Sequence, residues 1–334
     1  MRSTTRAAPV EAPAFGGFPV KRRTLGFSVL FAALLGGGAV QAADPASCKA
    51  VRFADVGWTD ITSTTAIASR LLKPLGYEPK TQVLSVPVTY ASLKSKDIDV
   101  FLGNWMPTME ADRKPYVDAG QIDVIGPNLK GAKYTLAVPA YLYDAGLKSF
   151  ADIAKFRDKL KDKIYGIEPG NDGNRLILGM IKDGKFDLKG FDLVESSEQG
   201  MLAQVDRAQR RKEPIVFLGW EPHPMNTKFA MKYLEGGDEV FGPNYGGAEI
   251  FTNLRAGYAK ECPNLGAFFN KLTFTLDTEN KVMGSILDDG MEGEKAAEKW
   301  LKSEPETWKP WLDGVTTLDG QPALPVVQKS LGLN

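Results

Sequence analysis

The sequence predicts an α/β protein with two halves, and three observations support this. Short apolar runs alternate with amphipathic segments of helical length, as in β-α-β units with mostly parallel sheets. Two apolar runs about 115 residues apart, 100–105 and 216–220, each reach a tryptophan just after a glycine, so each half is expected to present a tryptophan to a shared cleft. The alternative is that so short a similarity between the two runs arises by chance. No proline-rich or low-complexity segment separates the halves, which favours a short hinge crossed more than once.

The first elements follow from hydrophobic spacing. A strand is predicted at 51–56, and a helix over 61–75 has its leucines on one face and ends before Gly76. Two further apolar runs, 83–88 and 98–102, are predicted to be strands.

The middle of the chain continues this alternation, and its end is helical. The spacing predicts, in order, a strand at 134–138, a helix at 150–160, a strand at 164–167, a helix at 174–181, a strand near Leu193, a helix at 198–209 and a strand at 215–218. From Phe268 onward the pattern is helical, and we interpret Trp300, Trp308 and Trp311 as core packing because they recur at near-helical spacing.

Residues 1–42 have the features of a secretory signal peptide. A basic cluster at 21–23 precedes an apolar run at 25–35, and small residues follow up to a cleavage site ahead of Ala43. The alternative is a retained membrane anchor, but the run is shorter than the ~20 residues that a span needs. Because of the arginine pair within 21–23, the sequence does not decide between export by the general secretory (Sec) pathway and export by the twin-arginine pathway. We therefore expect a periplasmic protein.

The charge balance argues against nucleic acid as a partner. The chain has 41 basic and 41 acidic residues, so its formal net charge is zero. Without residues 1–42, which carry five basic residues and one acidic residue, 36 basic and 40 acidic residues remain, a net charge of −4. Nucleic-acid-binding proteins usually show a basic excess instead.

The two cysteines, Cys48 and Cys262, are an even number in a chain that is predicted to be exported. This favours one disulfide bond. The alternative is a pair of buried free thiols.

Enzymatic interpretations find little support. The single histidine, His223, lies between two prolines, and no Gly-x-Ser-x-Gly motif or set of zinc ligands accompanies it. The segment 166–174 is glycine-rich and lies between a predicted strand and helix, but it lacks the P-loop and dinucleotide-binding spacings. It places Asn171 at a helix start, either facing a cleft or as the N-cap of the helix. No cofactor and no metal are expected.

Aromatic residues gather near the predicted strand ends. Trp58 follows the first strand, Trp105 the third and Trp220 the strand at 215–218, while Tyr134 opens another run. Each of these residues, taken alone, is also a candidate for core packing. Facing one another, the rings would form a cage for a cation, and a quaternary ammonium suits it because this ion is large and has no N–H group to donate.

Asp60, two residues after Trp58, adds a carboxylate beside the predicted cage. It favours a ligand with net positive charge. The alternative role, compatible with the first, is N-cap of the helix that begins at Ile61.

With these residues in place, the sequence resembles the substrate-binding protein family of ABC importers for choline and glycine betaine, and especially its choline-binding periplasmic members. The resemblance covers nearly all of 48–320. Its most specific segments are 55–60, 97–112, 131–136, 165–174, 195–200 and 217–225.

The resemblance implies a two-lobed, type II periplasmic-binding-protein fold that closes over its ligand by hinge motion. Residues 43–127 and 225–334 would form lobe I, and residues 128–224 lobe II. Both cysteines would then lie in lobe I and form the family's disulfide.

The resemblance also implies a ligand and a partner. Choline would be the ligand and an ABC permease of the inner membrane the partner of a monomeric protein that performs no covalent chemistry. Three tryptophans and a tyrosine would cage the ammonium group, and an aspartate and an asparagine would hold the hydroxyl. The matching residues are Trp58, Trp105, Tyr134, Trp220, Asp60 and Asn171.

Two alternatives remain open. A glycine betaine binder is the nearest, but the betaine carboxylate would be repelled by Asp60. An exported hydrolase of choline esters or phosphocholine is the other, and the scarcity of nucleophiles and bases argues against it.

Overall fold

The computed structural model describes residues 8, 9, 11 and 43–333. The chain divides into Met1–Ala39 and Val40–Asn334, and the elements below all belong to the second part. The predicted signal peptide, 1–42, lies outside the described residues apart from Ala8, Pro9 and Glu11. Among the helices that the structure describes, none combines the length and apolar character that a membrane span requires.

The described strands form one nine-stranded mixed sheet in the order β2-β1-β3-β9-β4-β7-β5-β6, with β8 paired to β4. The strands are β1 (Ala50–Asp55), β2 (Glu78–Val83), β3 (Val100–Met106), β4 (Ile122–Pro139), β5 (Lys163–Tyr165), β6 (Asp192–Val194), β7 (Phe217–Glu221), β8 (Met231–Tyr233) and β9 (Gly247–Arg255). The predicted α/β class is confirmed, but the prediction of mostly parallel sheets was wrong. Pairs at the two ends of the sheet, such as β1–β2 and β5–β6, are parallel, whereas β3–β9, β9–β4 and β4–β7 are antiparallel.

Helical connections explain this mixture. Parallel neighbours need a crossover, and a helix joins β1 to β2, β2 to β3, β5 to β6 and β6 to β7. The central strands β4 and β9 pair antiparallel with their neighbours and are not subject to that requirement. β4 pairs with β9 from Ile122 to Lys133 and with β7 from Lys133 to Ala137, so one strand links the two ends of the sheet.

The helices fall into three groups along the chain. Before β4 come η1 (Ala46–Cys48), α1 (Thr59–Leu72), η2 (Lys73–Leu75), α2 (Val86–Ser95) and α3 (Glu110–Asp118). Between β4 and β8 come α4 (Ala140–Asp144), α5 (Phe150–Ile153), η3 (Ala154–Phe156), α6 (Arg157–Leu160), α7 (Asp172–Asp183), η4 (Lys185–Asp187), α8 (Glu198–Arg211) and α9 (Met225–Lys228). After β8 come α10 (Asp238–Phe241), α11 (Pro243–Gly246), α12 (Tyr258–Glu261), α13 (Pro263–Lys271), α14 (Leu276–Leu287), α15 (Gly293–Ser303), α16 (Pro305–Trp308), η5 (Lys309–Leu312) and α17 (Ala323–Leu331).

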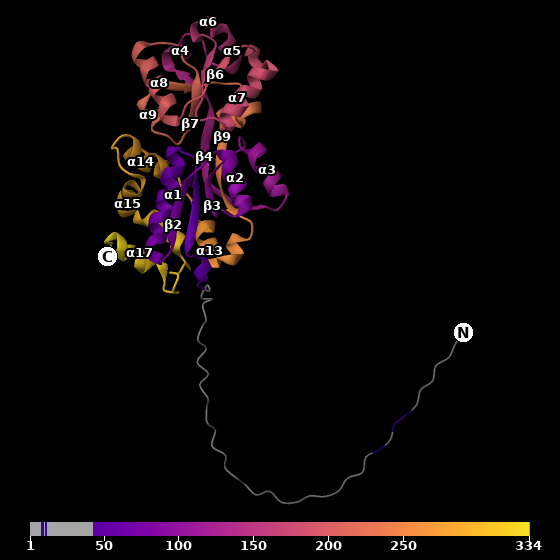
Figure 1. Cartoon of the computed structure of the whole chain (residues 1–334), viewed down its shortest axis with the longest axis vertical. Helices are drawn as coiled ribbons and strands as arrows, with labels where there is room; N and C mark the ends of the chain where they lie inside the picture. Colours follow the sequence, from indigo (N-terminus) through magenta and orange to yellow (C-terminus); the bar gives the residue numbers. More distant parts are fainter. Residues whose placement is uncertain (1–7, 10, 12–42, 334) are drawn as a thin grey trace, which may run out of the picture. The chain divides into compact units, whose positions relative to one another are not determined.

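Figure 1 shows how these groups cover the sheet. Helices α4 to α9 surround the end with β6 and β7, whereas α1, α2, α13, α14, α15 and α17 surround the end with β2 and β3. The labels of β4 and β9 lie between the two sets.

One predicted strand was largely misplaced. The run 83–88 was expected to be a strand, but β2 ends at Val83 and α2 begins at Val86, with Pro87 in its first turn, where no backbone N–H is needed. β2 is an exposed edge strand with mainly polar residues, and Val83 is 75% exposed. Hydrophobic alternation therefore gave little sign of it.

The helical tail packs as predicted. Trp300 stacks on Trp311, with ring centroids 6.1 Å apart. Trp308 is fully buried, and its Nε1 donates a hydrogen bond of 2.8 Å to the carbonyl of Leu301. These three tryptophans belong to the core.

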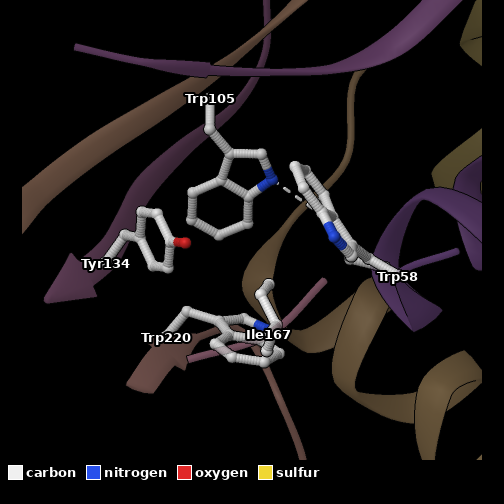
Figure 2. Close-up of a pocket in the computed structure, with 6 residues that line it drawn as sticks. Trp58, Trp105, Tyr134, Ile167 and Trp220 are labelled. Atoms are coloured by element: carbon white, nitrogen blue, oxygen red, sulfur yellow. Dashed lines mark hydrogen bonds between the residues drawn. The ribbon is translucent and has the colours of Figure 1, made fainter. Parts of the chain in front are cut away.

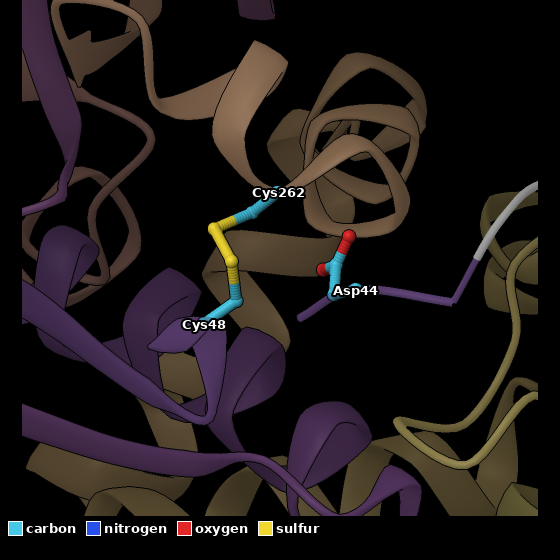
Figure 3. A group of neighbouring side chains, drawn as sticks. All are labelled: Asp44, Cys48 and Cys262. Carbon is cyan, nitrogen blue, oxygen red and sulfur yellow. A yellow bond between two sulfur atoms is a disulfide. The ribbon is translucent and has the colours of Figure 1, made fainter. Parts of the chain in front are cut away.

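The disulfide between Cys48 and Cys262 is present, which excludes the alternative of two free thiols. Its Cα atoms are 5.8 Å apart, a normal separation for a disulfide. Figure 3 shows Asp44 beside it. Asp44 accepts hydrogen bonds from the backbone N–H groups of Asn264 and Leu265, in the first turn of α13. The disulfide and this carboxylate both attach the segment before β1 to the start of α13.

Candidate ligand-binding site

Four aromatic rings from four separate elements surround one small pocket (Figure 2). Trp58 is the residue before α1, while Trp105, Tyr134 and Trp220 lie in β3, β4 and β7. All four residues are only 3–5% exposed. The structure thus brings together four rings that are distant in the sequence.

The rings are inclined to one another around the pocket. The centroids of Trp105 and Tyr134 are 5.8 Å apart, and those of Tyr134 and Trp220 are 6.3 Å apart, with interplanar angles of 56° and 78°. The pocket is small, with about 250 Å³ of space free of protein atoms, a figure that includes solvent at its mouth. The site is therefore suited to a small molecule that can contact several aromatic faces.

Strand pairing explains how two of these rings meet. Tyr134 of β4 lies directly opposite Trp220 of β7 in their antiparallel register. The sequence-based expectation that Trp105 and Trp220 follow the ends of their strands was wrong, since both lie inside strands that antiparallel partners extend. A short apolar run does not show how far its pairing continues.

Asp60 lies in the first turn of α1, which begins at Thr59 and not at Ile61 as predicted, so Asp60 is not the N-cap. Its Oδ2 accepts a hydrogen bond of 3.0 Å from Nε1 of Trp105. Its Oδ1 is buried and has no hydrogen-bond partner among the described residues, although buried polar atoms normally have one. Asp60 is one of the residues that line the pocket.

Several carboxyl groups at and around the pocket are shifted toward neutrality, and they include Glu279, whose pKa is raised well above its usual value by burial and by the charge of Asp60. Burial raises the pKa of Asp60 to about 7, and the nearby charge of Glu198 adds to this, whereas the bond from Trp105 opposes it. Burial also raises the pKa of Glu168 to about 7 and that of Asp172 to about 6. A bound cation would stabilise the ionised forms of these groups.

Glu168 supports the cage directly. Its Oε1 accepts a hydrogen bond of 2.8 Å from Nε1 of Trp58. Two of the three cage indoles, Trp58 and Trp105, thus donate to a carboxylate, which fixes their orientation.

Asn171 is the N-cap of α7, one of the two roles considered from the sequence. Its Oδ1 accepts hydrogen bonds from the backbone N–H of Asn174 at 3.1 Å and from the hydroxyl of Tyr134 at 2.9 Å. Its Nδ2 donates to Asp172 at 3.2 Å and carries a second proton. Asn171 therefore lies next to the pocket and holds the one phenol of the cage in place.

Sequence reasoning missed three residues of this region. Ile167 lines the pocket as an apolar wall, Glu168 orients Trp58, and Glu198 is buried beside the start of α1. Ile167 and Glu168 belong to the segment 166–174, and their position at the carboxyl end of a predicted strand was the available signal. Glu198 belongs to 195–200, one of the most specific segments of the resemblance, but its role did not follow from this because its partners are distant in the sequence.

His223 is engaged in packing and hydrogen bonding. Its Nδ1 accepts the backbone N–H of Met225 at 2.9 Å, so the neutral ring carries its proton on Nε2, which faces Glu198 at 3.3 Å. Its ring packs edge-on against Trp220, with centroids 5.1 Å apart. Among the described residues, one group has metal-ligand spacing, namely Asp44, Cys48 and Cys262, and its two cysteines form the disulfide.

Comparison with known proteins gives consistent matches. The family model described as the substrate-binding domain of an ABC-type glycine betaine transport system matches residues 49–303. An ABC-transporter choline-binding protein solved in complex with choline is 61% identical, with a TM-score of 0.85, and the match covers 86% of this chain and 100% of that chain. An ABC-transporter choline-binding protein in an unliganded semi-closed conformation is 62% identical, with a TM-score of 0.80 and the same coverage. The glycine betaine/carnitine transport binding protein GbuC of Listeria monocytogenes is 34% identical over 164 residues, which are 49% of this chain and 53% of that protein.

Proposed function

Because the chain belongs to the family of substrate-binding domains of ABC-type glycine betaine transport systems, we propose that it captures choline and delivers it to an ABC permease. It acts after export to the periplasm, as a monomer and without covalent chemistry. Its fold is that of the type II periplasmic binding proteins, as the sequence resemblance implied.

The observation that carries this proposal is the pocket itself, with four aromatic rings and one unpaired carboxylate oxygen. The trimethylammonium group lies among the rings of Trp58, Trp105, Tyr134 and Trp220. The hydroxyl of choline donates to Oδ1 of Asp60 and accepts from the second Nδ2 proton of Asn171. Each desolvated cation–π contact contributes about 2 kcal/mol, and the costs of association offset part of the sum, so micromolar affinity is attainable.

Binding requires the protein to open, because the four rings are almost fully buried. We assign residues 43–127 and 225–334 to lobe I and residues 128–224 to lobe II. However, α9 and β8 lie at the end of the sheet with β7, and β8 pairs with β4 at Ala137–Pro139, so the chain returns to lobe I at β9 and not at residue 225. The hydrogen bond from Trp58 to Glu168 crosses between these lobes, as does the 2.7 Å ion pair of Arg175 with Asp112. These contacts form when the lobes close.

The charges around the pocket favour choline over glycine betaine. Asp60 and Glu168 attract a cation, whereas the carboxylate of betaine would meet Asp60 without a compensating positive side chain in the pocket lining. Glycine betaine is therefore the ligand whose affinity should be compared with that of choline.

Calorimetric titration of the mature protein with choline, glycine betaine and acetylcholine tests the proposal. Trp105→Ala and Trp220→Ala should each weaken choline binding by about 2 kcal/mol or more, because each removes one cation–π contact. Tyr143→Ala, which removes a ring outside the pocket, is the matched control and should bind as the wild type does.

Three results would contradict the proposal. They are an affinity change below threefold for both tryptophan variants, tight binding of an anionic or uncharged solute in place of choline, and catalytic release of product from acetylcholine or phosphocholine above background. The last result would support the hydrolase alternative.

A further inference from the structure

Glu198 is a buried carboxylate whose hydrogen bonds join distant elements. It is the first residue of α8 and only 1% exposed. Its Oε2 accepts the backbone N–H of Thr59 at 2.9 Å, and its Oε1 accepts the Thr59 hydroxyl at 2.5 Å. Glu198 and Thr59 are 139 residues apart in the sequence.

These bonds supply what α1 itself lacks. The residue before α1 is Trp58, whose side chain makes no capping hydrogen bond, so the first N–H of the helix has no local partner. Glu198 provides that partner, and its negative charge lies at the helix end that carries positive partial charge. The capped residue, Thr59, stands between the cage ring Trp58 and the pocket carboxylate Asp60.

The same carboxylate also bonds to His223, which packs against another ring of the cage. Nε2 of His223 donates to Oε1 of Glu198 at 3.3 Å, and the ring of His223 packs against the cage ring Trp220. One buried side chain thus connects the start of α1, with Trp58 and Asp60, to His223 after β7 and, through the ring of His223, to Trp220 of β7.

We propose that Glu198 is a positioning residue that latches the two lobes closed around the bound ligand. Glu198 and His223 belong to lobe II and Thr59 to lobe I, so the bonds to Thr59 break when the lobes separate and form again when they close. The latch aligns Trp58 and Asp60 with Trp220 only in the closed form. This inference rests on the proposed function for its ligand and on the lobe assignment for its motion.

Binding kinetics test the latch. Stopped-flow tryptophan fluorescence with choline should show that Glu198→Ala raises the dissociation rate at least tenfold and leaves the association rate within about twofold, because the latch exists only after closure. Glu198→Gln should have a smaller effect, since its amide keeps one acceptor for Thr59 but sets a donor against Nε2–H of His223. Asp206→Asn, which removes an acid elsewhere on α8, is the matched control and should match the wild type in both rates.

Amide hydrogen exchange of the closed, ligand-bound protein gives a second readout that is separate from the binding rates. Glu198→Ala should speed exchange at Thr59 at least tenfold and leave Thr62 unchanged, because the N–H of Thr62 bonds to the carbonyl of Trp58 within the helix. General unfolding of α1 would accelerate both amides. If Glu198→Ala does not fold, Thr59→Val, which keeps the carboxylate and removes the hydroxyl bond, should still raise the dissociation rate.

Two results would overturn the latch: a dissociation rate within twofold of the wild type in Glu198→Ala, or equal acceleration of exchange at Thr59 and Thr62. If the wild type binds glycine betaine and not choline, while Glu198→Ala with betaine bound still loses protection selectively at Thr59, the proposed function is contradicted and the latch is supported.

Discussion

At the scale of single residues, Asp60 shows how binding and stability oppose each other. A buried carboxylate with one unpaired oxygen is unfavourable for folding, and its raised pKa expresses that cost. The same oxygen is what a cationic ligand with a hydroxyl group requires. Functional sites commonly retain such unfavourable groups.

The raised pKa of Asp60 predicts a pH dependence of affinity. Choline has a fixed charge, so lowering the pH through about 7 protonates Asp60 and removes its attraction for the cation. Choline should therefore bind up to about tenfold more weakly at pH 6 than at pH 8, whereas glycine betaine should not weaken. Titrations at both pH values measure this.

Asp60→Asn is the control for this pH effect. It should reduce the pH dependence for choline to the share contributed by Glu168, whose pKa is also about 7. It should also weaken choline more than betaine at pH 8. Equal losses of affinity for the two ligands, or an unchanged pH dependence in the variant, would show that the charge of Asp60 does not determine the preference for choline.

At the scale of elements, the start of α7 holds the ring of Tyr134 in the cage. The hydroxyl of Tyr134 bonds to Asn171, the N-cap of α7, and lies against Gly173 in the first turn. A Cβ atom at Gly173 would overlap that hydroxyl. A helix start and a strand therefore fit together only because position 173 has no side chain.

Gly173→Ala should displace the ring of Tyr134 and weaken choline binding at least tenfold. Gly179→Ala in the same helix is the matched control, because a Cβ atom there meets nothing within 4 Å. The control should keep its affinity and gain about 0.5–1 kcal/mol of stability from the better helix former. Calorimetry and thermal unfolding of both variants measure this, and equal affinities in the two would refute the packing argument.

At the scale of the whole molecule, one sheet links the lobes and one disulfide closes most of the described chain. β4 passes from the strands of one lobe to those of the other, so the pocket forms where the two sets of strands meet. The disulfide joins residues 214 apart and does not line the pocket. Its contribution should therefore be to stability and not to recognition.

Replacing both cysteines, Cys48→Ser with Cys262→Ser, should lower the free energy of unfolding by about 2–5 kcal/mol, because the unfolded chain loses a long cross-link. Choline affinity should stay within about threefold of the wild type. Urea unfolding and calorimetry measure the two quantities, with the reduced wild type as a second comparison. A large loss of affinity at unchanged stability would reverse this assignment.

Much of the fold and several features of the site were predictable from local pattern. Apolar runs and helical spacing predicted most elements and the packing of Trp300, Trp308 and Trp311, since burial repeats with the period of the element. The exposed edge strand β2 and the full lengths of β3 and β7 were not predictable in this way, because they depend on pairing with strands elsewhere.

The amino-acid sequence by itself determined which chemical groups the protein has for its site, namely aromatic rings, one nearby carboxylate and a helix-capping asparagine, together with its two cysteines. Only the tertiary structure decided that Tyr134 lies opposite Trp220, that Oδ1 of Asp60 has no partner, and that Glu198 caps a helix 139 residues away. The physical reason is the distance along the chain over which each interaction acts. Local spacing reports which side of an element is buried, whereas the partner of a buried polar atom is set by how separate elements pack.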